Sequence, residues 1–466
     1  MACITKSNSN NFVKFRKVNG SISLENLQQN GIPDTCNNIF LAPPKNLTAK
    51  IENGVNVVLN WENVSGESRF RIERSNSPDS GYSFLANVAR NVTTYTDTTA
   101  TREISQYYRV RAGHESGSSA YSNIASVLIT GAEIDIDTSN TSSGSSTSTQ
   151  FKLPLESSGA YRFTVDWGDG NEDLITSWDQ PEVTHTYGVL GSYTLKVYGQ
   201  LTGWRFNNTG DKLKVTDFVD WGDLNLGNSG DHFNGCTNLV ITAGADLDME
   251  GVTSLSSSFR NCTSLTSFPL IDTSNVTDFT STWFSCTGLT SFPLIDVSSA
   301  TELSQTWRNC QSITSFPLIN TSTITNFFRT WRSNEALTSF PLIDTSNATS
   351  MEGVWDGCIG LLTFPLIDTS NTTTLDGAWE SCLSLTSFPA INLSSVTGTG
   401  ADMLFDTNIG TVSYDALLIA TDGLSVNNNV TLDVGSAQYT LGGAAETART
   451  NLINDHSWTI NDGGGV

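Results

Sequence analysis

The stretch SFPLIDTSNVT, residues 267–277, decides the fold because close copies of it return five more times at intervals of 24 residues. A fixed period of this length is typical of a solenoid, in which each turn of chain buries its apolar side against the next turn. The later copies begin at Ser291, Ser315, Ser339, Thr363 and Ser387. The period therefore predicts a stack of 24-residue rungs.

Three kinds of apolar residue recur at fixed places in the repeat, and we predict that they form its core. A tryptophan repeated in register is more often core than a platform for sugars, which is the alternative. The cysteines lie one rung apart and point the same way, so we expect buried thiols rather than disulfides. The columns are Trp283, Trp307, Trp331, Trp355 and Trp379; Phe268, Phe292, Phe316, Phe340, Phe364 and Phe388; and Cys262, Cys286, Cys310, Cys358 and Cys382, with Asn334 interrupting the cysteines.

Two polar features of the repeat predict its local geometry. A proline follows each phenylalanine, as Pro269 follows Phe268, and proline has no amide proton to donate to a β-ladder. We therefore expect a strand of three or four residues over Leu265–Phe268 and its equivalents, with the proline turning the corner. Aspartates also stack, at Asp272, Asp296, Asp344 and Asp368. They would either bind cations or cap the turn that follows, and we favour the cap.

Length and charge limit the function of the whole chain. A chain of 466 residues is too long for one core, so we expect several domains. With 47 acidic and 24 basic residues the net charge is -23, which disfavours binding to nucleic acid or anionic membranes. No apolar run reaches the roughly 18 to 20 residues that span a bilayer, so we expect no membrane insertion. The first 20 residues lack the apolar core of a secretory signal.

Residues 43–130 alternate between apolar and polar side chains in seven short runs separated by turn residues, which predicts a β-sandwich. With Trp61 in the second run and Tyr108 followed by Arg109 and Val110 in the sixth, the segment 41–131 resembles a fibronectin type III domain. The resemblance implies that Trp61 is core and that Tyr108 makes a corner hydrogen bond. It also implies a spacer or adhesion module.

The next segment begins with a polar stretch, TSNTSSGSSTST at 138–149, from which we predict a flexible linker over 132–150. Residues 151–203 contain Trp167-Gly168-Asp169-Gly170, a strong hairpin-turn signal. With His185-Thr186-Tyr187 downstream, this segment resembles a polycystic kidney disease (PKD) type β-sandwich. Asp166 and Asp169 are candidate ligands for a structural calcium ion, although aspartates that simply form the turn are the commoner case. We predict no other cofactor.

Residues 204–410 carry the pattern aromatic-x-x-Cys-x-x-Leu in about five regular rungs. They resemble the BspA-type leucine-rich repeats of bacterial surface proteins. Residues 411–466 break the period, and we predict helices over 414–420 and 444–455 and a last strand near the end, together forming a cap. The expected fold class is thus mainly β and multi-domain: a fibronectin type III β-sandwich, a PKD-like β-sandwich, a leucine-rich-repeat solenoid and a small α/β C-terminal cap.

The residues that could carry chemistry are few. Four histidines lie in four different segments, none in a nucleophile motif, so we predict that the chain is not an enzyme. Between residues 252 and 400 the only basic residues are Arg260, Arg308, Arg329 and Arg332. We predict a ligand site formed by Arg308, Arg329, Arg332 and Phe284, suited to an anionic glycan or a carboxylate. The alternative is local pairing of the arginines with acids such as Glu302 or Glu335.

The order of segments gives the functional hypothesis. A basic arm at 1–40, two spacers, a repeat surface and a cap look like a bacteriophage virion protein: a tail fibre, receptor-binding protein or head decoration protein. The arm would attach to other virion proteins, and the repeats would contact a host cell-surface glycan or protein. The alternative is a bacterial cell-surface adhesin, located outside the cell and exported without a standard signal peptide; a third is a glycan-active enzyme. The sequence leaves open whether the chain forms a homo-oligomer.

Overall fold

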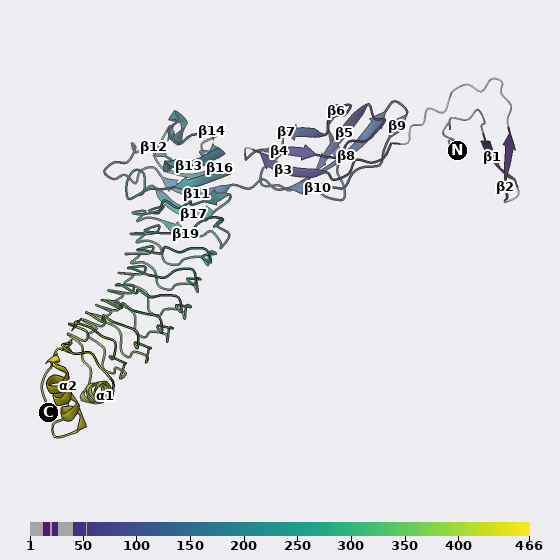
Figure 1. The fold of residues 1–466 in the computed structure, drawn as a ribbon. Helices are drawn as coiled ribbons and strands as arrows, with labels where there is room; N and C mark the ends of the chain where they lie inside the picture. Colours follow the sequence, from purple (N-terminus) through teal and green to yellow (C-terminus); the bar gives the residue numbers. More distant parts are fainter. Residues whose placement is uncertain (1–12, 19–20, 27–40, 53) are drawn as a thin grey trace. The chain divides into compact units, whose positions relative to one another are not determined.

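The computed structural model describes residues 13–18, 21–26, 41–52 and 54–466, and these residues are mainly β. The chain divides into two compact units, Met1–Ile129 and Thr130–Val466, which are described separately (Figure 1). Most of the predicted arm at 1–40 lies outside the described residues. Its described part is an antiparallel pair, β1 (Val13–Val18) and β2 (Ser21–Asn26).

From residue 41 onward the first unit contains two further antiparallel sheets, and all seven predicted strands are present. One sheet has the order β3 (Thr48–Glu52), β4 (Asn56–Asn60), β7 (Thr94–Asp97). The other has the order β10 (Ala125–Val127), β8 (Gln106–His114), β5 (Arg69–Ser75), β6 (Ser83–Ala89), and a short β9 (Gly117–Ser118) pairs with β8.

The core of this unit follows the alternation of its strands. Trp61 is buried and meets the edge of Phe70, with ring centroids 5.5 Å apart. Tyr108 is fully buried, and its hydroxyl donates to the Asp97 carboxylate at 2.9 Å. Asp97 also accepts from Arg74 at 2.7 Å, so a buried carboxylate holds β7 to both β8 and β5.

The second unit begins with a seven-stranded sheet that extends across two predicted boundaries. Its order is β14 (Glu172–Ile175), β13 (Leu155–Asp166), β16 (Ser192–Trp204), β11 (Ala132–Asp137), β17 (Val215–Asp220), β19 (Val240–Ile241), with β18 (Leu224–Asn225) beside β16. A separate pair joins β12 (Gln150–Lys152) to β15 (Thr184–Thr186), which follows the 3-10 turn η1 (Pro181–Val183).

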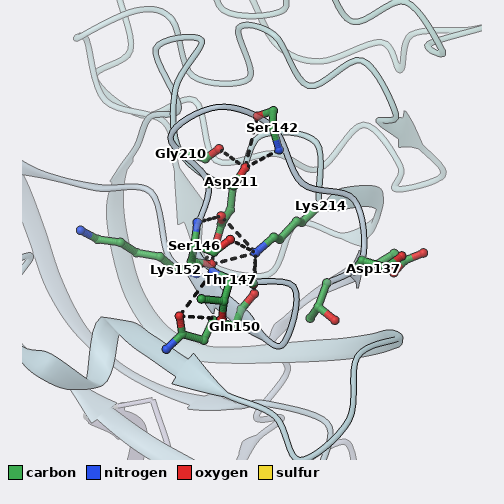
Figure 2. A network of polar contacts seen from close by, with 12 residues as sticks. Asp137, Ser142, Ser146, Thr147, Gln150, Lys152, Gly210, Asp211 and Lys214 are labelled. Atoms are coloured by element: carbon green, nitrogen blue, oxygen red, sulfur yellow. Dashed lines mark hydrogen bonds and ion pairs between the residues drawn. The ribbon is translucent and has the colours of Figure 1, made fainter.

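The predicted linker at 132–150 is therefore wrong, because β11 is an inner strand of this sheet. The predicted boundary at 203/204 is also wrong, because it falls at the end of β16 and separates it from β17. The serine-rich loop that looked flexible is held by a buried ion pair, Lys214 and Asp211, whose side chains are both fully buried (Figure 2). Lys214 Nζ donates to the carbonyls of Ser146, Thr147 and Gln150 at 3.2, 2.8 and 2.7 Å.

Beyond β19 the chain forms the stack of 24-residue rungs, and backbone hydrogen bonds join each rung to the next. The amide of Trp283 donates to Thr306 O at 2.9 Å, and Trp307 and Trp331 repeat this bond at 3.0 and 2.9 Å. Isolated parallel bridges such as Asn326↔Ser350 lie beside these bonds. One buried apolar cluster extends from Ala132 to Trp458, so the sheet, the rungs and the C-terminal part share one core.

The strand expected over Leu265–Phe268 and its equivalents is wrong, since the rungs form no strand there. The backbone contacts between neighbouring rungs in this region are single bonds, such as that from Thr290 N–H to Thr266 O at 3.1 Å, or isolated bridges, such as Thr363↔Ser387. The proline does turn the corner: Pro269 O accepts from Ile271 N–H at 3.1 Å, a three-residue turn that leaves Leu270 at its tip. The turn takes up the residues that a longer ladder would need.

The C-terminal part contains the two helices that the sequence predicts, α1 (Thr411–Asp422) and α2 (Ala444–His456). Three short parallel strands lie before, between and after them in the chain, in the order β20 (Thr399–Gly400), β21 (Thr431–Asp433), β22 (Thr459–Asn461). Each helix buries leucines against the last rungs, such as Leu417 and Leu452. This part covers the C-terminal end of the shared core (Figure 1).

Candidate functional site

The predicted ligand residues lie on successive rungs, in the column that directly follows the stacked aromatic side chains. Arg260, Phe284, Arg308 and Arg332 occupy this column in order. The guanidinium carbon of Arg260 lies 4.3 Å from the centroid of the Phe284 ring, and that of Arg308 lies 5.2 Å from the same centroid. Two cations therefore share one half-buried aromatic ring, a contact that stabilises each of them.

The other two arginines form ion pairs. Arg332 contacts Asp356 at 2.9 Å, and Arg329 contacts Glu352 at 3.3 Å. The alternative, local pairing with neighbouring acids, is thus confirmed for Arg329 and Arg332, although the acids given as examples, Glu302 and Glu335, are not their partners. Glu302 instead accepts from Ser304 and Asn326, while Glu335 accepts from Gln311.

Arg308 and Arg260 have no carboxylate partner in the part of the chain that the structure describes. Arg308 Nη1 donates to the neutral Oε1 of Gln305 at 2.9 Å. Burial lowers the pKa of Arg308, and the nearby cations Arg332 and Arg329 lower it further. Because an arginine stays protonated well above neutral pH, Arg308 keeps its positive charge, on which Asp356 acts without forming an ion pair.

The local fold explains why these side chains meet. Each rung contains two residues with left-handed backbone, and Arg329 is one of them, with a φ of 51°. Its equivalents Gln305 and Gly353 have φ of 56° and 58°, so the conformation belongs to the rung and not to a special site. The 24-residue period then places equivalent residues above one another. Since their backbone conformation is the same, the rungs differ at this position only in the side chain.

The arrangement can bind an anion through Arg308 and Arg260. A guanidinium has five N–H donors in a planar fork that fits a carboxylate or sulfate, and Arg308 uses one nitrogen for Gln305. The sequence prediction included Arg308, Arg329, Arg332 and Phe284 but missed Arg260, Glu352 and Asp356. The signal for Arg260 was present, since it lies one period before Phe284. No sequence pattern pointed to Glu352. It pairs with Arg329 but lies one residue before Gly353, which is the equivalent of Arg329 in the next rung.

The three core columns are buried throughout. The five tryptophans are at most 1% exposed, with neighbouring indoles stacked 5.3 to 5.8 Å apart, so their faces are not available to a sugar. The phenylalanines are 4 to 8% exposed. The repeat cysteines are free thiols, and burial raises their pKa, to about 12 for Cys310 and Cys358. Cys286 Sγ donates to Phe259 O at 3.0 Å, a bond repeated up the column.

The predicted calcium ligands Asp166 and Asp169 do not fit a metal ion. Asp166 accepts from the Gly168 amide at 2.9 Å. Asp169 uses one oxygen for Asn171 and the other for His185 at 2.8 Å, and the hydrogen bond from His185 lowers the pKa of Asp169. Both carboxylates thus serve the turn. No group of three or more His, Cys, Asp and Glu side chains that could hold a metal occurs among the described residues.

The stacked aspartates also cap turns. Asp272 accepts from the Ser274 amide at 3.0 Å and Asp344 from that of Ser346 at 3.0 Å. These hydrogen bonds lower the pKa of both aspartates. The column therefore carries negative charge at neutral pH.

One histidine contacts a serine, but both are enclosed. His232 Nδ1 lies 2.8 Å from Ser258 Oγ, and both residues are 0% exposed. Burial lowers the pKa of His232 to about 4. The serine hydroxyl is closed to any substrate, so the pair is part of the core.

Comparison with protein-family models finds no match, and comparison with curated proteins finds none. Among solved structures, the chain is 27% identical to an Fn3-like protein from Clostridium thermocellum over 18% of this chain and 91% of that one, with a TM-score of 0.17. It is 11% identical to the pectate lyase Pel3 from Pectobacterium carotovorum over 85% of this chain and 78% of that one, also with a TM-score of 0.17. TM-scores this low establish neither a shared fold nor a shared reaction.

Within the described part of the chain, neither α-helix has the length and apolar character needed to cross a membrane.

Proposed function

We propose that this chain is a non-enzymatic structural and adhesion protein of a bacteriophage particle, which presents its rungs to the surface of a host cell. In this proposal it is a tail fibre, a receptor-binding protein or a head decoration protein located on the virion. Residues 1–40 attach it to other virion proteins. The partner at the rungs is an anionic glycan or a carboxylate-bearing protein of the host surface.

The observation that carries the proposal is the pair of arginines on Phe284. Residues 130–466 contain 11 basic and 37 acidic residues, yet Arg260 and Arg308 lie together without a carboxylate among the described residues. The acidic surroundings attract these two cations only at long range, so a ligand anion could pair directly with their guanidinium groups. A stack of rungs built around one shared core is also suited to surface contact rather than to an enclosed reaction site.

The finer fold assignments belong to the same proposal. Residues 41–131 would be a fibronectin type III spacer. The buried Trp61 packed on Phe70 and the hydrogen bond from Tyr108 to Asp97 support this assignment. The hairpin at Trp167–Gly170 would belong to a PKD-like sandwich. The rungs would be leucine-rich repeats of the BspA type, and residues 411–466 their cap.

The ligand site is tested with the double variant Arg260→Ser/Arg308→Ser in adsorption of the purified protein to host cells. We expect at least a tenfold loss of binding, and binding of the unchanged protein should weaken as salt rises. The matched control is Lys152→Ser/Arg162→Ser, which removes two exposed basic residues from the same unit away from the rungs. Undiminished adsorption of the first variant, or equal loss in both, would reject the site.

The location is tested separately, by mass spectrometry of purified phage particles. We expect the chain in the particle, and we expect deletion of residues 1–40 to abolish its incorporation. Recovery of the chain in a bacterial envelope fraction instead would support the alternative, a cell-surface adhesin.

A further inference from the structure

A row of leucines lies exposed along the rungs, away from the shared core. Leu270 is 54% exposed, and the four equivalents after it are 60 to 61% exposed. The row consists of Leu270, Leu294, Leu318, Leu342 and Leu366. Single exposed leucines are ordinary, but an apolar row that continues over five rungs marks an interaction surface.

Nothing inside the rung explains why this position stays leucine. The neighbouring repeated residues have structural duties: Pro269 accepts the turn hydrogen bond, and Asp272 caps the next turn. Thr273 donates across to the following rung, to Asp296 O at 2.7 Å. The position after the cysteine has diverged, to Thr263, Thr287, Gln311, Glu335, Ile359 and Leu383, whereas the exposed Ser267 position keeps a small hydroxyl residue. An exposed column that keeps one large apolar residue therefore serves a contact outside its own rung.

The geometry of the row is regular. Each leucine lies between a proline and an isoleucine, and the first four occupy the tip of a turn closed by a hydrogen bond between those two residues. The buried phenylalanine two residues before each leucine stacks on its copy in the next rung, with ring centroids 6.0 to 6.1 Å apart, so the row repeats once per rung. Exposed hydroxyls such as Ser267 precede the tip, and exposed carboxylates such as Asp272 follow it. The row is an apolar edge with a neutral flank and an acidic flank.

The geometry points to a second copy of this chain as the partner of the leucine row. A second copy has the same spacing, so all five leucines can meet five leucines without loss of register. An edge of identical residues that pairs with itself is the usual isologous contact of a dimer.

The flanks decide the orientation of the two copies. In an antiparallel pair the aspartate flanks face each other, and charges such as Asp272 of one copy and Asp368 of the other repel across the contact. In a parallel pair, with the two-fold axis along the row, the aspartate flank of one copy faces the serine flank of the other. Serine hydroxyls can donate to the carboxylates there, so the dimer is parallel.

The test uses the full chain and its mass in solution by light scattering. At concentrations up to about 100 μM, where a dimer with a micromolar Kd is largely formed, we expect twice the 50.3 kDa of one chain. The variant Leu294→Ser/Leu318→Ser/Leu342→Ser should run as a monomer. The control Leu174→Ser/Leu190→Ser/Leu441→Ser removes three leucines of 53 to 54% exposure elsewhere in the same unit and should remain a dimer. A monomeric unchanged chain, or a dimer that survives the first variant, overturns the inference.

Cross-linking tests the orientation. In a background with Cys3→Ser and Cys36→Ser, the variant Leu270→Cys should form a covalent dimer on mild oxidation, because a parallel pair brings equivalent end positions together. In an antiparallel pair Leu270 of one copy would lie opposite Leu366 of the other. Leu270→Cys alone would then form no covalent dimer, whereas a mixture of Leu270→Cys and Leu366→Cys would, and this result would refute the parallel arrangement.

Salt separates this contact from a charge-driven one. The apolar contact should persist or strengthen between about 0.05 and 0.5 M NaCl, because salt screens the repulsion between two acidic chains. Dissociation over the same range would indicate a charge-driven contact instead and would overturn the inference.

Discussion

Removing the buried ammonium of Lys214 should release the loop at 142–150 from the sheet. Lys214 and Asp211 are both fully buried, with Nζ and Oδ1 3.2 Å apart, and the burial lowers the pKa of Lys214. The variant Lys214→Met keeps the length of the side chain but leaves the Asp211 carboxylate without its counter-ion (Figure 2). Breaking a buried pair from one side costs about 3–5 kcal/mol.

The hydrogen bonds around Lys214 and Asp211 determine where within the range of about 3–5 kcal/mol the cost of Lys214→Met should fall. The carbonyls of Thr147 and Gln150 lose their donor at 2.8 and 2.7 Å. Asp211 keeps two backbone donors, the amides of Ser146 and Lys152, each at 2.7 Å, which partly stabilise its charge. We therefore expect a loss of about 3 kcal/mol in the free energy that holds the loop closed.

The assay is hydrogen exchange at the amides of Ser146 and Lys152, since both amides donate to Asp211. A loss of about 3 kcal/mol corresponds to a protection factor roughly 100-fold lower. Urea unfolding followed by tryptophan fluorescence provides the global check, because ten of the 11 tryptophans lie in the second unit.

The double variant Asp211→Leu/Lys214→Met serves as the control, because it removes both charges and should recover part of the loss. A hydrogen-exchange protection factor at Ser146 and Lys152 that changes less than about threefold in Lys214→Met would refute the reasoning. A buried carboxylate without its counter-ion should destabilise the closed loop by more than that.

Two further predictions concern buried polar groups of the second unit. Burial holds the pKa of His232 at about 4, below its ordinary 6.5, so the unfolded chain takes up the proton first as pH falls, and stability is lost on going from about pH 6.5 down to about pH 4. Between about pH 7 and pH 5 urea titrations should show the variant His232→Gln losing about 2 kcal/mol less than the unchanged chain; equal losses would contradict this. Asn334 Nδ2 is buried without a partner, while Asn334 Oδ1 accepts from the Cys310 amide at 2.8 Å. Asn334→Cys, which restores the column residue, should raise stability by about 1 kcal/mol in thermal unfolding, and a lower midpoint would count against it.

The parts of the fold that a local period encodes could be predicted from the sequence. The core columns containing Trp283, Phe268 and Cys262 follow from spacing alone, because a residue repeated every 24 positions must lie above its copy. The seven strands of the first unit follow from alternation. The strand at Leu265–Phe268 was predicted wrongly, because propensity does not reveal how few hydrogen bonds a rung leaves for a ladder once Pro269 has turned the chain.

The loop at 142–150 could not be predicted, for a different reason. Its composition is that of a linker, and what orders it is a pair of charges more than 60 residues away in the sequence, Asp211 and Lys214. The candidate site was found only in part for the same reason. The period placed Arg308 beside Phe284, whereas the ion pairs of Arg329 and Arg332 depend on side-chain reach, which no repeat pattern encodes.

The rung-to-rung bonds have a consequence for how such a gene can change. Because each rung bonds to residues 23 or 24 positions away, cutting out residues 291–314 would join two ends whose new neighbours match the old ones in kind. Near-identical segments invite unequal recombination, which removes or inserts whole copies. The height of the stack can therefore vary between descendants, while the sheet at one end and the helices at the other stay intact.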